Sequence, residues 1–331
     1  MQQDDPMLDP EFFLASVSKG WAPRVVTVYW ARDIVGIMYT RERVISGVPT
    51  GVVYADGGLG EIFLGNPWHQ QNAFQVAVGT LFASSKIHGV RLRILRGSRE
   101  LDAIRQLAAR KTIDTHYFRM RDNSSRNWKY HAHLPLADSY EEFLDGLGST
   151  TRHNFRYYRR RFEEAGHCFV ERLSMSELRF AAIGLAAKCR SSHEPPSYAL
   201  ERDLNMVAAA NRPIAIGLKH RNGELLSVIG GWYRPCGAVL LFQSNNDRDF
   251  GRSSLSVVLR AYFIESLISQ GLRELVIWAG TAPPLSRYVT YRPAIGVHLD
   301  APTYAWRVAR FLISRVRFWL PRRLADAANW F

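Results

Sequence analysis

The order of apolar patterns along the chain constrains its fold more than any single motif does. In the second half, alternation and helical spacing follow one another in a fixed order. The predicted elements are strands 213–219, 225–233 and 238–244, helix 253–270 and strand 274–278. The first half shows a similar order. Its elements are strands 25–30, 34–39 and 52–54, helix 70–84, strand 90–95, helix 101–109 and strand 128–136. This repetition predicts an α/β fold made of two related units in tandem, joined near residue 136.

Three segments follow from this pattern. We expect an N-terminal unit over residues 1–136 and a C-terminal unit over 137–300. Residues 301–331 should form a basic amphipathic helix, centred on 303–320, and a tail. The chain has 331 residues, of which 47% are hydrophobic, so each unit is long enough to bury a core of its own.

The charge balance predicts an anionic partner. Lys plus Arg number 43 and Asp plus Glu number 30, which gives a formal net charge of +13. A phosphate-bearing cofactor, a nucleic acid and an acidic lipid headgroup would each suit such a chain. Charge alone leaves these three open.

Several classes of protein fit the sequence poorly. The cysteines Cys168, Cys189 and Cys236 are far apart and form no CxxC pair, which argues against a disulfide framework or a zinc site and for a reducing, cytoplasmic setting. The scattered histidines show no metal-ligand spacing, so we expect no metal. Residues 1–10 carry three aspartates and do not look like a secretory signal. We also expect no membrane-spanning segment, because no uncharged apolar run reaches about 18 residues.

The most informative motif lies where strand 238–244 meets helix 253–270. The connecting loop reads Arg248-x-x-Gly251-x-Ser253. A helix N-terminus offers unpaired backbone N–H groups and partial positive charge, which suit a pyrophosphate. Gly251 would let the backbone approach a ligand closely, and Ser253 or Ser254 could cap the helix or donate to phosphate. An ordinary loop with a serine cap and solvated arginines would give the same pattern.

This motif and its surroundings resemble the GNAT acetyltransferase superfamily, in which Arg-x-x-Gly-x-(Gly/Ala) is the acyl-CoA pyrophosphate loop. Ser253 departs from the pattern at its last position. The layout over residues 25–300 is more closely similar to tandem-GNAT, FemAB-like proteins of the cellulose-biosynthesis (CelD/BcsL-type) acetyltransferase family. In those proteins a basic helix like 151–160 precedes the C-terminal unit. The first half has no such loop, because Phe63-Leu64-Gly65-Asn66-Pro67 could not hold phosphate in the same way.

The resemblance implies two GNAT-like units and an N- or O-acyltransferase that uses acetyl-CoA or another acyl-CoA. A backbone amide of strand 238–244 should polarise the thioester, and the loop should fix the pyrophosphate. The implied acyl-CoA-binding residues are Phe242, Gln243, Ser244, Arg248, Phe250, Gly251, Arg252, Ser253 and Ser254. For the acid that reprotonates the CoA thiolate, Tyr288 is the first candidate and Tyr291 the second. Each could equally be a packed aromatic residue.

The acceptor site is less clearly marked. His193 and Glu194 precede Pro195-Pro196 and could line it, and Asn245 could bind an acceptor amide, but no residue stands out as the general base. Arg152 and Arg156 lie with Arg159 and Arg160 on one arc of the helix over 150–165. They could face an acidic acceptor or simply be solvated.

Two further partners remain to be weighed. Arginines and aromatic residues alternate over 303–323, which suits either an anionic membrane surface on the inner face of the membrane or docking on the protein body. FemAB-like relatives that use aminoacyl-tRNA suggest a tRNA donor as an alternative. No RNA-binding signature such as an RRM or KH motif is present, which argues against nucleic acid. A third alternative is a GNAT-fold protein without catalysis that binds anionic membrane or nucleic acid.

Overall fold

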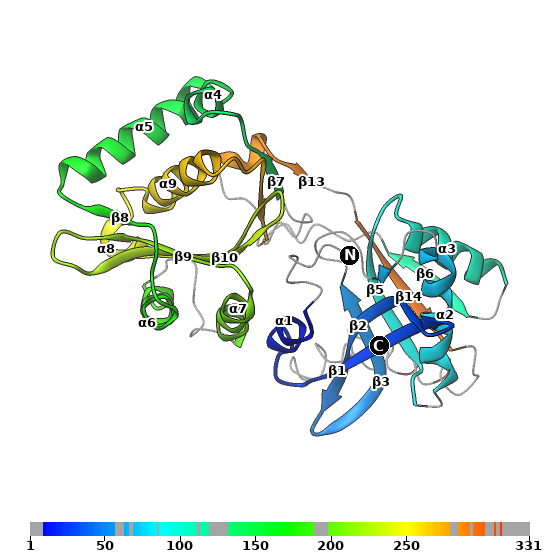
Figure 1. The fold of residues 1–331 in the computed structure, drawn as a ribbon. Coiled ribbons are helices and arrows are strands. Elements are labelled where there is room, and N and C mark those ends of the chain that lie inside the picture. The colour runs from blue at the N-terminus through cyan, green and yellow to red at the C-terminus, as the bar shows by residue number, and fades with distance from the viewer. Residues whose placement is uncertain are drawn as a thin grey trace. The chain divides into compact units, whose positions relative to one another are not determined.

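The computed structural model describes residues 9–56, 63–65, 69–84, 86–110, 113–118, 132–188, 198–278, 284–291, 294–301, 308 and 312. The chain divides into two compact units (Figure 1). The first unit, which we call the carboxyl unit, contains Met1–Ser18 and Ser124–Tyr291. The second, the amino unit, contains Lys19–Asn123 and Arg292–Phe331.

The carboxyl unit is built on a seven-stranded sheet with the order β13-β7-β12-β11-β10-β9-β8. Its strands are β7 (Ala132–Pro135), β8 (Cys168–Val170), β9 (Pro213–Lys219), β10 (Leu225–Arg234), β11 (Gly237–Asn245), β12 (Glu274–Ile277) and β13 (Thr290–Tyr291). All of its pairs are antiparallel except β11 with β12. Strands β9 and β10 meet at the turn predicted over 221–224.

Helices cover both faces of this sheet (Figure 1). Helices α4 (Tyr140–Asp145), α5 (Ser149–Glu164) and α9 (Leu255–Ser269) lie on one face, and α6 (Met175–Ala186) and α7 (Tyr198–Ala209) on the other. Between the sheet and the first group is a core in which Phe155, Leu259 and Ile229 are fully buried. Helix α1 (Pro10–Ala15) joins the second group, where Phe12 packs edge-on against Trp232 with ring centroids 5.0 Å apart.

Three of the predicted helix ends have identifiable caps. The Ser139 side chain accepts from the Glu142 N–H at the start of α4. Ser174 and Glu177 form a reciprocal capping box at the start of α6. Gly166, which follows α5, has a φ of +73°, the left-handed conformation that ends helices and favours glycine.

The amino unit has a second sheet with the order β1-β2-β3-β5-β14-β6, and β4 pairs with β2. Its strands are β1 (Trp21–Trp30), β2 (Asp33–Ile45), β3 (Val48–Asp56), β4 (Leu64–Gly65), β5 (Gly89–Leu95), β6 (Asp114–Phe118) and β14 (Ala294–Asp300). Helices α2 (Gln70–Ala83) and α3 (Arg99–Ala109) supply Phe74 and Ile104 to its core.

The two sheets share one topological feature. Among its described strands, each contains a single parallel pair, β3 with β5 and β11 with β12. In each case a helix lies between the paired strands in sequence. All other pairs in both sheets are antiparallel. The predicted α/β class is confirmed, and so are the mixed sheets flanked by helices.

The sheet of the amino unit takes one strand, β14, from beyond the carboxyl unit in sequence. Strand β7 inserts between β12 and β13, and β14 inserts between β5 and β6. The boundaries predicted at residues 136 and 300 followed element order alone. They therefore differ from this contact-based division, which places Ala132–Pro135 in the carboxyl unit and Ala294–Asp300 in the amino unit.

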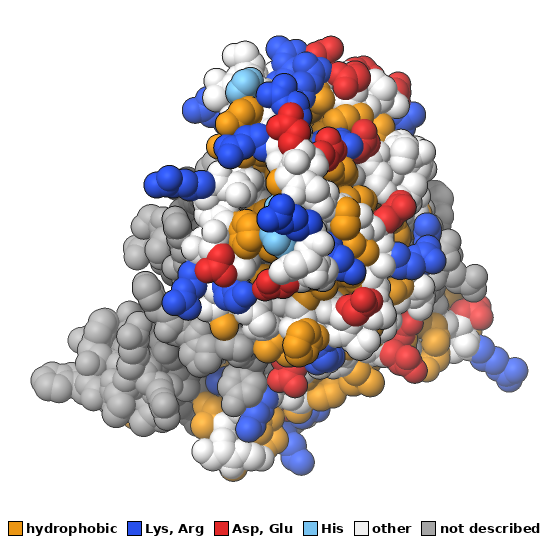
Figure 2. Space-filling model, turned by 90° about the vertical axis from the view of Figure 1, so that its left-hand side faces the viewer, with side chains coloured by type: hydrophobic (Ala, Val, Ile, Leu, Met, Phe, Trp, Pro, Cys, Tyr) orange, Lys and Arg blue, Asp and Glu red, His pale blue; other side chains and the backbone are white. Residues whose placement is uncertain are grey.

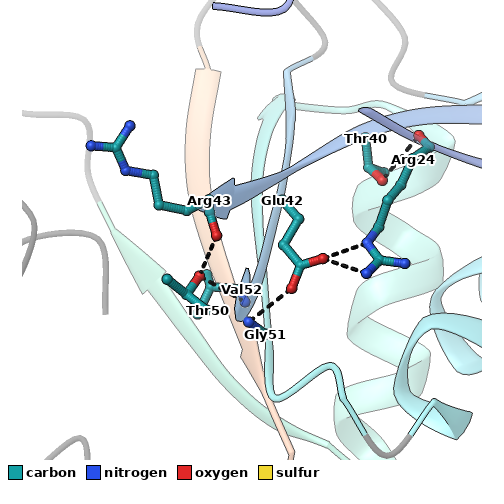
Figure 3. A network of polar contacts seen from close by, with 7 residues as sticks. All are labelled: Arg24, Thr40, Glu42, Arg43, Thr50, Gly51 and Val52. Carbon is teal, nitrogen blue, oxygen red and sulfur yellow. Dashed lines mark hydrogen bonds and ion pairs between the residues drawn. The ribbon is translucent and has the colours of Figure 1, made fainter. Parts of the chain in front are cut away.

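A buried carboxylate holds the first three strands of the amino unit together (Figure 3). Glu42 accepts from Arg24 Nε at 2.6 Å and from the Gly51 N–H at 2.9 Å, and its side chain is 1% exposed. Gly51 has a φ of +71°, and a Cβ there would press against the Lys86 carbonyl. Thr50 adds a bond to the Arg43 carbonyl at 2.9 Å.

The sequence patterns did not predict α1, β4, β6, β8, β13, β14 or the short helix α8 (Asp247–Phe250). The helix predicted over 303–320 lies outside the described residues except for two isolated positions. Within the described part of the chain, no helix is both long and apolar enough to cross a bilayer.

Candidate functional site

The parallel pair in the carboxyl unit is open at one end. The β11–β12 ladder runs only from Gly237 to Leu240, closing with a bond from the Trp278 N–H to the Leu240 carbonyl at 2.9 Å. From Leu241 to Asn245, β10 is the only described strand that pairs with β11. This part of β11 therefore offers one free backbone edge, which we call the β11 opening.

A bulge marks the start of the β11 opening. Gly230 of β10 lies opposite Phe242 and Gly231 lies opposite Leu240, so Leu241 has no partner on β10. Two adjacent glycines make the close approach possible. A Cβ at Gly231 would overlap the Val239 carbonyl, and one at Gly230 would overlap the Phe242 ring. The ladder is thus irregular within the strand from which the sequence predicted the polarising amide.

The loop that follows β11 is more structured than the motif predicted. Asn246 caps α8 by accepting from the Asp249 N–H, and the Arg248 N–H donates to the Lys188 carbonyl at 3.2 Å. The N–H groups of Phe250 and Ser253 are also engaged within the loop. Gly251 has a φ of −60°, so its backbone conformation is open to any residue.

The first turn of α9 retains free donors. The N–H groups of Ser254, Leu255 and Ser256 make no hydrogen bond within the described part of the chain. Ser254 occupies the N-cap position with a φ of +46°, and its side chain makes no capping bond. A left-handed serine at a helix start is strained, and such strain is found more often at functional positions. Unengaged amides at a helix N-terminus are the kind of group that binds anions.

Polar side chains gather on the face of β11 that lies against α9. Gln243 Nε2 donates to Asn245 Oδ1 at 3.2 Å and to the Ser256 carbonyl at 3.3 Å. Gln243 Oε1 accepts from Arg260 Nε at 2.9 Å. The structure thus brings two predicted site residues, Gln243 and Asn245, to the first turn of α9. Arg260 was not predicted. Its signal in the sequence is a lone arginine within the apolar run of the helix.

Other predicted residues lie elsewhere in this region. The Phe242 side chain is buried and lies across Gly230, and Ser244 is also buried. Arg248, Gly251, Arg252 and Ser253 are exposed.

Phe250 packs beside a pair of histidines whose ring centroids are 4.5 Å apart. Its ring contacts His220 at 5.8 Å and His167 at 6.5 Å between ring centroids. Burial, reinforced by the nearby His220 and Arg221, lowers the pKa of His167 below its usual value.

The two candidate tyrosines have different surroundings. The Tyr288 hydroxyl accepts from the Gly148 N–H at 2.7 Å, at the start of α5. Hydrogen bonds from Thr151 and then from this N–H lower the pKa of Tyr288. Tyr291 lies in β13 opposite Ala132 and packs against the core. Their catalytic roles stay predictions.

The two arginines of α5 that were predicted to bind the acceptor are paired with acids. Arg152 Nη1 meets Asp145 Oδ1 at 2.6 Å, and Arg156 Nη2 meets Glu141 Oε2 at 2.5 Å, both from α4. Figure 2 shows Lys and Arg side chains beside Asp and Glu side chains at its upper end, where α4 and α5 lie in Figure 1. Exposed pairs of this kind contribute little to stability and could exchange partners on ligand binding. The proposed acceptor residues His193 and Glu194 lie outside the described residues.

The amino unit has no equivalent opening in the part that the structure describes. Strand β3 pairs with β5 from Val52 to Asp56, its last residue. Near Gly51, where β3 is irregular, the buried Glu42 carboxylate accepts the backbone N–H, so this donor is not free for a ligand.

Similar solved structures share this fold. FemX aligns with a TM-score of 0.61 and 10% identity, over 88% of this chain and 94% of that chain. L-PGS from Bacillus licheniformis aligns with a TM-score of 0.55 and 13% identity, over 93% and 96%. A conserved protein of unknown function from Bacteroides thetaiotaomicron aligns with a TM-score of 0.55 and 9% identity, over 91% and 93%. The sequence itself matches no family model and no curated protein sequence. The prediction of two tandem GNAT-like units is confirmed at the level of the fold.

Proposed function

We propose that the chain is an acyltransferase that binds an acyl-CoA along the β11 opening and transfers the acyl group to an amine or hydroxyl. The single observation that carries the proposal is the continuity of the opening with the unengaged N–H groups of Ser254, Leu255 and Ser256. A pyrophosphate at these amides and a pantetheine chain along β11 would bring the thioester toward the bulge at Leu241.

The chemistry would be direct transfer. The acceptor nitrogen or oxygen attacks the thioester carbonyl and loses its proton to a base, while a backbone N–H of β11 stabilises the developing oxyanion. The C–S bond then breaks, and the CoA thiolate takes a proton. Tyr288 is the proposed acid because its pKa is lowered, with Tyr291 as the second candidate. Arg152, Arg156, Asn245, His193 and Glu194 are proposed on the acceptor side.

The donor is proposed as acetyl-CoA or a related acyl-CoA, and the acceptor as an envelope-related, sugar, lipid or small-molecule amine or hydroxyl. The narrower resemblance to the CelD type remains a prediction. A cytoplasmic location, with contact to the inner face of the membrane through residues 303–323, also remains a prediction.

The test is thermal unfolding with and without acetyl-CoA. We expect acetyl-CoA to raise the melting temperature of the native protein, because it binds only the folded state. The double variant Arg248→Ala, Gly251→Val should lose this shift. The matched control is Arg179→Ala, Gly184→Val on α6, where Gly184 has no neighbour within 4 Å. A shift that persists in the first variant would remove the proposed site.

One observation favours a second donor. Arg156, Arg160 and Arg161 are exposed along α5 and would suit a polyanion such as aminoacyl-tRNA, which FemAB-like resemblance also suggests. Protection by charged tRNA, with no response to acetyl-CoA, would support an aminoacyl transferase instead. Salt-sensitive binding to anionic vesicles or RNA, without any transferase activity, would indicate a non-catalytic binding protein.

A further inference from the structure

A charged side chain that the proposed reaction does not use is buried beside the β11 opening. Arg260 lies in the second turn of α9, and the residue is 7% exposed. The comparable buried arginine of the amino unit, Arg91, has a carboxylate partner in Asp300 at 2.9 Å. Arg260 forms no ion pair with a described acid. It therefore differs from the usual pattern, in which a buried charge is paired.

The groups around Arg260 are neutral. Its Nε donates to Gln243 Oε1, and Gln243 in turn bonds Asn245 and the Ser256 carbonyl. The Ser227 hydroxyl completes the cluster with a bond to Asn245 Oδ1 at 2.6 Å. The two terminal nitrogens of Arg260 have no partner in the described part of the chain. Both nitrogens therefore keep their donor capacity.

The local charge distribution favours an anion at this position. The N-terminus of α9, five residues before Arg260, carries partial positive charge. The acids closest in sequence have other partners, because Asp249 is held by Asn246 and Lys188, and Glu265 by Arg159. Burial lowers the pKa of Arg260 to about 10, which still leaves it charged at neutral pH. An uncompensated buried cation is costly, and a ligand anion would offset that cost.

We infer that Arg260 is an anion-binding residue that pairs with a carboxylate or phosphate of the ligand held along the β11 opening, next to the first turn of α9. The location of that ligand rests on the proposed function. The anionic group could belong to the acyl chain of the donor or to the acceptor. Gln243 is a positioning residue, since it fixes the guanidinium through Nε and leaves both terminal nitrogens for the anion.

The experiment compares the native chain with Arg260→Gln and Arg260→Met. Arg179→Gln is the control for loss of a half-buried arginine outside the site. Thermal unfolding is measured without ligand and with sodium phosphate, sodium succinate, acetyl-CoA or succinyl-CoA. Without ligand, we expect Arg260→Met to melt at the same or a higher temperature, because an unpaired buried charge has been removed. Phosphate or succinate should stabilise the native protein and the control, but neither Arg260 variant.

Calorimetry then distinguishes the two sources of the anion. If the anion is on the acyl chain, native protein should bind succinyl-CoA about tenfold to a hundredfold more tightly than acetyl-CoA, and Arg260→Gln should lose that preference. Equal affinity for the two CoA esters, with phosphate or succinate stabilisation still lost in Arg260→Gln, would assign the anion to the acceptor.

Two results would overturn the inference. One is an Arg260→Gln protein that responds to all four ligands as the native protein does. The other is a lower melting temperature of both Arg260 variants without ligand, together with unchanged ligand responses, which would mean a purely structural arginine. Failure of the proposed function would give a different experimental result from failure of this inference. Then neither CoA ester binds the native protein, although phosphate or succinate still stabilises it through Arg260.

Discussion

At the scale of single residues, the candidate site depends on two glycines whose place no other residue could take. Gly230 and Gly231 let β10 approach β11 so closely that Leu241 is left without a partner. Adjacent glycines inside a strand pattern are a signal for such a bulge. The sequence therefore carries the signal for a bulge. The pattern alone does not show which strand lies opposite it.

Substituting one of these glycines should be costly. Gly231→Ala places a Cβ against the Val239 carbonyl, and we expect it to lower the free energy of unfolding by about 2 kcal/mol or more, measured by urea denaturation. Gly184→Ala is the control, since Gly184 lies in α6 with open space around it. That change should raise stability by about 0.5–1 kcal/mol. Equal effects at the two positions would contradict the packing described for the bulge.

Arg260 and Ser254 show why the rest of the site was harder to predict. Helical periodicity places Arg260 in α9, but its hydrogen-bond partner, Gln243, comes from the neighbouring strand β11. Ser254 was predicted as a possible cap, and it does occupy the N-cap position, yet its backbone turns left-handed and its side chain does not cap. Local patterns predict where a helix begins more reliably than they predict the hydrogen-bond partners of its first backbone N–H groups.

At the scale of elements, the start of α5 is held by a side chain more than a hundred positions away. Gly148 has no side chain with which to cap the helix, and the Tyr288 hydroxyl accepts its N–H instead. Tyr288 thereby connects the segment after β12 to the helix that carries Arg152. The sequence predicted separate roles for these two residues, Tyr288 as a candidate acid and Arg152 as a candidate acceptor-binding residue, and did not connect them.

Tyr288→Phe should weaken this helix start, costing about 1 kcal/mol as other lost caps do. The effect should depend on pH. Because the pKa of Tyr288 is lowered in the folded state, ionisation of the phenol favours folding. That contribution is fully present above the ordinary phenol pKa of about 10 and is lost as pH falls through the lowered value. The difference in unfolding free energy between native and variant proteins should thus be larger at pH 10 than at pH 8.

Spectroscopic titration checks the cause. Thr151→Ala removes the largest contribution and should move the Tyr288 pKa back toward its ordinary value. A Tyr288 pKa that is unaffected by Thr151→Ala would contradict this explanation. If Tyr288 is also the catalytic acid, Tyr288→Phe should lower kcat much more than it lowers stability.

At the scale of the whole molecule, sequence patterns could not predict that β14 returns to the amino unit. The repeated order of strands and helices predicted two related units correctly, because each unit follows the same local alternation. Strand pairing is harder to predict than element order. Strand β14 pairs with β5 across about two thirds of the chain, and no local pattern identifies so distant a partner. The predicted boundaries followed sequence order for the same reason.

The buried pair between Arg91 and Asp300 connects β5 to β14 and gives a direct test of this long-range pairing. Asp300→Ala leaves the buried guanidinium without this carboxylate and should destabilise the amino unit by about 3–5 kcal/mol, measured by calorimetric unfolding. The double variant Arg91→Met, Asp300→Leu should recover much of that loss. Asp102→Ala, which breaks an exposed pair with Arg105, should cost less than about 1 kcal/mol. A small effect of Asp300→Ala would contradict the burial of this pair.

The position of β14 also affects how the protein can be made in a cell. Ribosomes deliver the chain from its N-terminus, so residues 19–118 emerge long before the strand that fits between β5 and β6. The edges of β5 and β6 that pair with β14 therefore stay unpaired in this sheet until Ala294–Asp300 leaves the exit tunnel. Nascent chains arrested before that point should be caught by chaperones that recognise open strand edges, and chains arrested well beyond it should be released.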